Sequence, residues 1–235
     1  MLAPLSTLQS SLRLGTFNVG CGFSRKLPTI LARSVDLSLD IVALQEIGDP
    51  ALHSNNLSQY SLAYSGGPSQ HEAGVGLLLS HDLAPLCRTY KRSPSGRLVG
   101  AVLELARGHQ LLVVSAYMPT GLDHRTAADA ATKTAHALYT ELITWTLGMQ
   151  QVIVLGDLNE TLTPHDRHPR PAAAASHRAA DSPIQCLVRE GFVDASRTPI
   201  LHAFLASRTR FAAPHETAAA ALITSGRWAA LQPQC

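Results

Sequence analysis

The feature that most constrains the fold is a short apolar run that ends in polar residues, Val152 to Thr161 (VIVLGDLNET). A bounded run of Val, Ile, Val and Leu is typical of a strand that is buried on both faces. Gly156 removes a side chain where the backbone turns or another group comes close. Side chains two residues apart at a strand end point the same way, so we expect Asp157 and Asn159 to share one pocket wall. The simpler alternative is a strand followed by an Asx turn.

Two earlier apolar runs also end in polar residues. We expect strands over Leu12–Val19, which carries Asn18 near its end, and over Asp40–Leu44, which is followed by Gln45 and Glu46. Between them, apolar residues at helical spacing predict an amphipathic helix over residues 25–39, with Pro28 in its first turn. A strand, a helix and a second strand in this order imply a crossover unit.

The middle of the chain has the alternation of an antiparallel sheet. Strands are expected at 60–65, 74–80 and 86–90. The run LVGAVLELA after Gly96 and Arg97 is joined by a turn at 107–110 to LLVVSAY, which predicts a long hairpin. Pro119 follows closely and leaves the phenol of Tyr117 at a strand end.

The remaining segments are predicted with weaker patterns. Residues 124–147 form the longest helical segment, with an apolar stripe that should pack on the sheet. We expect a flexible insertion at 163–182, a helix at 183–190 and a short strand at 192–195. The alanine-rich tail is expected to be helical from Pro214 to Gly226, because it has no strand pattern.

Composition indicates one globular domain, 12–211, between an N-terminal tail (1–11) and an atypical C-terminal tail (212–235). Hydrophobic residues make up 46% of the chain, yet no apolar run approaches the length of a membrane span, and no secretory signal is evident. We therefore expect an intracellular protein, nuclear or cytoplasmic, without a membrane contact or an obligate protein partner. Four scattered cysteines and eleven scattered histidines suggest neither a zinc site nor a disulfide framework. A net charge of +2 permits a polyanionic partner without requiring one.

The polar residues at the predicted strand ends all carry oxygen, which favours a hard-cation site. They are Asn18, Glu46, Tyr117, Asp157 and Asn159. Mg²⁺ takes one or two carboxylate ligands and leaves other positions to water and phosphate, a role that Glu46 with Asn18 fits. Asp157 would then orient or deprotonate a water molecule, while Asn159 and Tyr117 hold phosphate oxygens.

The order of six motifs resembles the endonuclease/exonuclease/phosphatase superfamily, which includes abasic-site endonucleases and deoxyribonuclease I. The motifs are TFNV, DIVALQE, AGVGLLLS, SGRLVGAVLEL, LLVVSAYMPTG and VIVLGDLNET. The resemblance implies an α+β fold in which two mixed β-sheets pack as a sandwich with helices on the outer faces. It implies Mg²⁺ (or Mn²⁺) on Glu46 with Asn18 close by, DNA as the partner, and Asp157, Asn159 and Tyr117 as catalytic residues. Arg97 and Asn18 would contact the substrate.

Within that superfamily, the segments PIQCLVREGFVDASR and GDLNET look most like the endonuclease domain of non-long-terminal-repeat retrotransposons. A phosphatase or phosphodiesterase acting on inositol phosphates or lipids is the alternative enzyme. The superfamily also has late strands that carry an aspartate and a Ser-Asp-His element, and no match is found here. The nearest triplets are Pro164-His165-Asp166, Ser176-His177-Arg178 and Pro214-His215-Glu216. We therefore expect a C-terminally truncated, weakly active or decayed domain that lacks the last strands.

Overall fold

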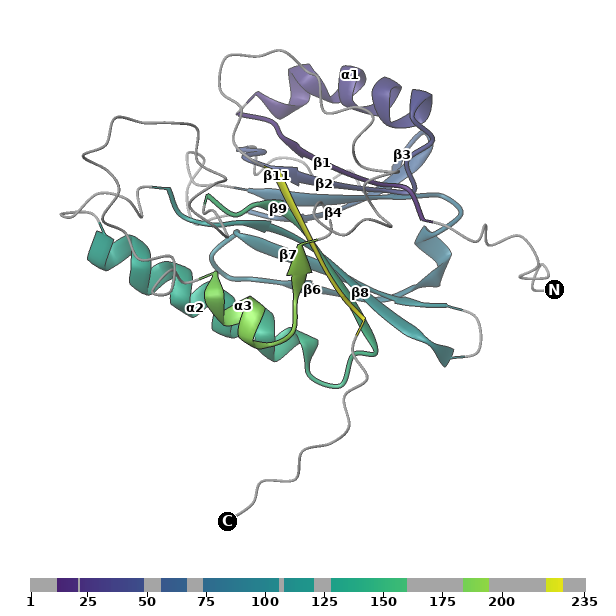
Figure 1. Ribbon diagram of the computed structural model, residues 1–235. Coiled ribbons are helices and arrows are strands. Elements are labelled where there is room, and N and C mark those ends of the chain that lie inside the picture. Colours follow the sequence, from purple (N-terminus) through teal and green to yellow (C-terminus); the bar gives the residue numbers. More distant parts are fainter. Residues whose placement is uncertain are drawn as a thin grey trace.

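The computed structural model describes residues 12–20, 22–48, 56–66, 74–105, 108–120, 128–159, 184–194 and 219–225. Two mixed β-sheets pack face to face in this part of the chain, with helices on the outer faces (Figure 1). This arrangement confirms the predicted α+β sandwich. The tail at 1–11, the insertion at 163–182 and the three histidine triplets lie outside the described residues.

The strands fall into a five-stranded and a six-stranded sheet. The first has the order β1 (Leu14–Asn18), β2 (Ile41–Gln45), β5 (Val75–Ser80), β4 (Tyr60–Ser65) and β3 (Asn56–Leu57). The second has the order β10 (Val193–Asp194), β11 (Ala219–Ser225), β9 (Gln151–Asp157), β8 (Gln110–Tyr117), β7 (Leu98–Glu104) and β6 (Cys87–Arg92). A short 3₁₀ helix, η1 (Ala84–Leu86), precedes β6.

Helix α1 (Phe23–Asp36) is the crossover between the parallel strands β1 and β2. It covers the outer face of the five-stranded sheet, where Phe23 and Ile30 pack against Val42, Leu44 and Leu78 (Figure 1). The helix begins two residues earlier than predicted. Pro28 therefore lies inside the helix and not in its first turn.

Helix α2 (Ala128–Thr146) covers the outer face of the six-stranded sheet, together with the short helix α3 (Gln185–Arg189) (Figure 1). Leu138, Tyr139 and Leu142 are fully or almost fully buried against residues of β7, β8 and β9. The predicted apolar stripe is confirmed, because these positions share one face of the helix.

The space between the two sheets is filled by the inward-facing residues of both. Ile41, Leu77 and Leu79 of one sheet meet Val99, Val113 and Leu155 of the other, and each is at most 2% exposed. Because side chains alternate along a strand, the same parity that buries these residues also aims the last residues of β1, β8 and β9 into the interlayer space.

The expectation of a helical, strand-free C-terminal tail is wrong. Residues 219–225 form β11, which pairs antiparallel with β9 along its whole length, from Ala219 opposite Asp157 to Ser225 opposite Gln151. The sequence AAALITS has too much alanine to suggest a strand. Its pairing with the otherwise open edge of β9 outweighs that weak local preference.

Two parallel strand pairs bring the predicted site residues to one end of the sandwich. Asn18 is opposite Gln45 in the β1–β2 pair, and Tyr117 is opposite Asp157 in the β8–β9 pair. Strand β1 lies against β9, and β2 lies against β8. Since the carboxyl ends of parallel strands share one edge, residues that follow β1, β2, β8 and β9 come together.

Candidate active site

Glu46, the residue directly after β2, accepts two hydrogen bonds on the same carboxylate oxygen. Tyr117 Oη donates to Glu46 Oε1 at 2.7 Å, and Asn18 Nδ2 donates to it at 3.0 Å. The backbone of Glu46 has a φ of 53°, which is uncommon for a residue other than glycine. A backbone conformation of this kind persists where the surrounding structure holds the residue firmly. Here the carboxylate of Glu46 is held by Asn18 of β1 and Tyr117 of β8.

Asn18 links Glu46 to Asp157. The same Asn18 Nδ2 that contacts Glu46 also donates to Asp157 Oδ2 at 2.9 Å, while Asn18 Oδ1 accepts from the backbone N–H of Gly20 at 2.9 Å. Asp157 is only 3% exposed, so each hydrogen bond to it matters for the cost of keeping a carboxylate in the protein interior.

Asn159 completes the polar wall. Its backbone N–H donates to Asp157 Oδ1 at 3.1 Å, and its side-chain Nδ2 donates to the carbonyl of Met118 at 2.8 Å. The first bond is the Asx turn that formed the simpler alternative, and it is present. Among the described residues no hydrogen bond reaches the side-chain oxygen of Asn159, so this oxygen can accept from a ligand.

Arg97 brings a positive charge to the cluster. Its guanidinium lies 5.2 Å from the ring centroid of Tyr117, and its Nη1 is 3.5 Å from the carbonyl oxygen of Tyr117. Burial of Tyr117 and its hydrogen bond to Glu46 raise the pKa of the phenol well above its usual range, an effect that Arg97 partly offsets. Tyr117 therefore keeps its proton at neutral pH and acts as a donor.

The residues present fit a magnesium-type ion better than a softer metal. Among the described residues, no three His, Cys, Asp or Glu side chains come together. The oxygen ligand is instead the carboxylate of Glu46, and one or two carboxylates are what Mg²⁺ accepts from proteins. Asn18 turns its side-chain Nδ2, which cannot bind a cation, toward Glu46 and Asp157, so its part here is to hold the carboxylates. Within the described part of the chain, no hydrogen bond reaches Glu46 Oε2, so this oxygen can serve as a ligand.

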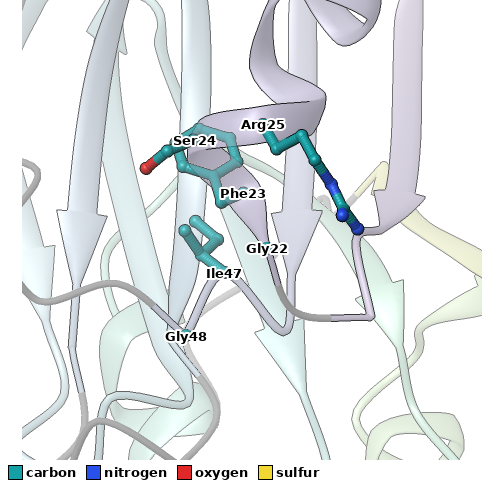
Figure 2. A pocket seen from close by; sticks show the side chains of 6 residues that line it. All are labelled: Gly22, Phe23, Ser24, Arg25, Ile47 and Gly48. Atoms are coloured by element: carbon teal, nitrogen blue, oxygen red, sulfur yellow. The ribbon is translucent and has the colours of Figure 1, made fainter.

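A pocket of about 480 Å³ lies between the start of α1 and the loop after β2 (Figure 2). Figure 2 shows its walls, which are the first residues of α1 and the loop after β2: Gly22, Phe23, Ser24, Arg25, Ile47 and Gly48. Ile47 follows Glu46 directly, but its side chain packs with Val19 and Phe23 under α1, and none of the six residues proposed from the sequence lines the pocket. Arg25 is exposed and adds a positive charge to the rim.

The structure thus brings together all six residues proposed from the sequence, and their chemical roles remain predictions. It also adds one residue, Lys26, that no sequence pattern indicated. Lys26 Nζ donates to the carbonyl of Val19 and contacts that of Gly20 at 3.4 Å, which holds the loop after Asn18. Its position within a helical stripe offered no signal, since a lysine on a helix face is usually solvated.

Neither a membrane span nor a cystine appears among the described residues. No described helix is long and apolar enough to cross a bilayer. Cys87 and Cys186, the two cysteines within the described ranges, form no disulfide bond.

Residues 15–220 match the model of the Endonuclease/Exonuclease/phosphatase family. A search of curated proteins finds no match. Solved structures with the same fold include an AP endonuclease from Archaeoglobus fulgidus, with 19% identity, a TM-score of 0.62, and coverage of 91% of this chain and 87% of that one. The catalytic domain of APE2 from Xenopus laevis has 17% identity, a TM-score of 0.59, and coverage of 77% and 70%.

A third similar structure is the 3′ phosphatase NExo from Neisseria, solved with a product DNA hairpin. It has 18% identity, a TM-score of 0.58, and coverage of 80% of this chain and 74% of that one. At these identities the similarity establishes the fold alone.

Proposed function

This chain belongs to the Endonuclease/Exonuclease/phosphatase family, and from that premise we propose that it is a Mg²⁺- or Mn²⁺-dependent hydrolase that cuts phosphodiester bonds in DNA. The observation that carries this proposal is the bridge made by Asn18, whose Nδ2 contacts both Glu46 and Asp157. One amide thereby ties a carboxylate suited to a cation to a buried carboxylate suited to a water molecule.

Each residue of the cluster has a task in hydrolysis. Glu46, with Asn18 beside it, would hold the cation, which supplies charge neutralisation at the phosphate and the leaving oxygen. Asp157 is held by hydrogen bonds on both oxygens, so it is oriented to accept the proton of the attacking water. The water oxygen forms the new bond to phosphorus as the bond to the ester oxygen breaks. Asn159, Tyr117 and Arg97 would contact the phosphate oxygens.

Two observations favour DNA over inositol phosphates or lipids as the substrate: the basic residues of this part of the molecule and the printed names of the similar solved structures. Arg97 lies over the ring of Tyr117 within the cluster, and Arg25 is exposed near the start of α1; both are positive side chains that can contact phosphates. The similar structures are named as AP endonucleases and as a phosphatase bound to a DNA hairpin.

The test is a panel of substrates. Supercoiled plasmid, a duplex with one abasic site, and soluble inositol phosphates are incubated with the purified chain and Mg²⁺, with Glu46→Gln as the inactive control. We expect nicking of DNA that needs Mg²⁺ and is lost in the variant. Phosphate release from inositol phosphates without DNA nicking would replace the proposal with the phosphatase alternative.

The finer assignment, a retrotransposon endonuclease that is truncated or decayed, is supported by the motifs GDLNET and PIQCLVREGFVDASR. These segments correspond to the end of β9 and to α3 with β10. To test it, plasmid nicking by this chain is compared with nicking by a version lengthened with a family-type Ser-Asp-His terminus. Equal rates, both lost on Glu46→Gln, would show that the added element is dispensable. A gain of about 10² or more would support truncation, since this is the usual contribution of a general base.

A further inference from the structure

A chain of four hydrogen-bonding groups joins helix α2 to the turn that carries Arg97. The backbone N–H of Arg97 donates to Ser95 Oγ at 3.3 Å. Ser95 Oγ and Ser93 Oγ are 2.7 Å apart, and Ser93 Oγ donates to Glu141 Oε2 at 2.8 Å. Glu141 is a residue of α2, 48 positions from Ser93, so the contact fixes the turn to the outer layer of the molecule.

The direction of this chain follows from the number of protons. A hydroxyl group has one proton, and the hydroxyl of Ser93 uses its proton in the hydrogen bond to the carboxylate of Glu141. The proton between the two serines must therefore come from Ser95. All donors then point from Arg97 through Ser95 and Ser93 to Glu141, an arrangement in which each bond polarises and strengthens the next.

The anchoring point is buried and has further support. Ser93 is 3% exposed, and its carbonyl accepts from Ser65 Oγ at 2.9 Å and from the N–H of Gly96 at 3.0 Å. Ser93 is therefore held by both sheets and by α2. The turn after it has little freedom, since both ends of the turn are fixed: Ser93 N–H donates to the carbonyl of Leu98 at 3.0 Å.

The other end of this series of hydrogen bonds is the candidate active-site cluster. The carbonyl oxygen of Arg97 accepts from the N–H of Tyr117 at 2.9 Å, and the guanidinium of Arg97 lies over the Tyr117 ring. Tyr117 Oη in turn donates to Glu46. We propose that Glu141 is a positioning residue, which acts through Ser93 and Ser95 to hold Arg97 over Tyr117 in the orientation needed for a substrate phosphate. This inference rests on the proposed function, because the phosphate contact presumes the hydrolase activity.

Three single variants separate positioning from a general effect on stability. Glu141→Ala removes the acceptor for Ser93, whereas Glu141→Gln keeps an oxygen that can accept the same bond. Thr140→Ala is the matched control. Thr140 is the exposed neighbour on α2, and in the described part of the chain its hydroxyl donates only to the carbonyl of His136 in the same helix. For Glu141→Ala we expect a fall in kcat/KM of roughly tenfold, within the range for coupled residues of one network, with Glu141→Gln close to the unchanged protein.

A double-mutant cycle with Arg97→Ala gives the decisive kinetic result. If Glu141 acts through Arg97, the double variant Glu141→Ala/Arg97→Ala should be as slow as Arg97→Ala alone. Losses that multiply would overturn the proposal, as would a Glu141→Gln variant that is as slow as Glu141→Ala.

A second readout does not depend on activity. The NεH resonance of Arg97 should be shifted by the ring of Tyr117, and Glu141→Ala should move it toward the value of a free arginine, while Thr140→Ala should leave it in place. A resonance that Glu141→Ala does not move would refute the positioning role. If the unchanged protein cuts no DNA, the proposed function fails, and the resonance still decides whether Glu141 positions Arg97.

Discussion

Gly156→Ala tests the packing that places Asp157. A Cβ at this position would lie 1.9 Å from the carbonyl oxygen of Ala116 and less than 3 Å from two more backbone atoms of that residue. Since ordinary contacts begin near 3.4 Å, strands β8 and β9 would have to separate by about 1.5 Å at this point. The backbone of Gly156 also has a φ of +156°, which other residues rarely adopt.

The expected loss of stability has two contributions. Overpacking costs about 1–3 kcal/mol, and the backbone conformation costs about 1–3 kcal/mol more. A total of about 4 kcal/mol lies in the middle of this range, and with a urea m-value of about 2 kcal/mol per M it lowers the unfolding midpoint by about 2 M. The proposed nuclease activity should fall as well, because Asp157 is the next residue.

The matched control is Gly148→Ala. Gly148 also has a positive φ, +79°, but no atom lies within 4 Å of the position of its Cβ. Only the backbone cost of about 1–2 kcal/mol then applies. Urea unfolding followed by circular dichroism measures both variants. Equal midpoints for Gly156→Ala and Gly148→Ala would refute the close approach of β8 to β9 as the reason for the glycine.

Three further predictions concern the cation, the phenol and the last strand. Glu46→Gln should weaken Mg²⁺ binding in calorimetric titration by at least roughly tenfold, because the amide lacks the charge, and Asp157→Asn should weaken it less; equal losses would contradict the division of roles. The raised pKa of Tyr117 means that stability due to its neutral form is complete below pH about 10 and is lost as pH rises further. The free energy of unfolding of Tyr117→Phe should therefore decline less steeply above that pH, and parallel curves would speak against burial of the phenol. A chain that ends at residue 218 should unfold at lower urea and aggregate, because β9 loses β11 and exposes its edge; unchanged light scattering would argue against the pairing.

Most of the fold was predictable, because buried strands and the buried faces of helices each give a characteristic local spacing of apolar residues in the sequence. Alternation and apolar runs indicated β4, β5, β7, β8 and β9, and the polar residue at the end of each parallel strand indicated where the site would lie. The strand β11 was missed because its pairing depends on an edge more than sixty residues away, not on its own alanine-rich sequence.

The site was predictable only in part, for a related reason. Asn18, Glu46 and Asp157 sit at strand ends, so topology alone brings them together. Glu141 is a polar residue on an amphipathic helix, where a glutamate usually faces water. Its contact with Ser93 depends on the rotation of α2 over the sheet, which side-chain packing sets and periodicity does not describe.

The hydrogen bonds of Asn18 to Glu46 and Asp157 also have a consequence for the folding of the newly synthesised chain. The bond to Asp157 closes a loop of 139 residues between β1 and β9, and these strands belong to different sheets. Contacts of such long sequence separation form late, because the entropy of closing the loop is lost before the contact is gained. Glu46 and Asp157 therefore come close to each other only after the two sheets have packed together. A nascent or misfolded chain holds these carboxylates apart, so the proposed hydrolase activity is expected only of the completed fold.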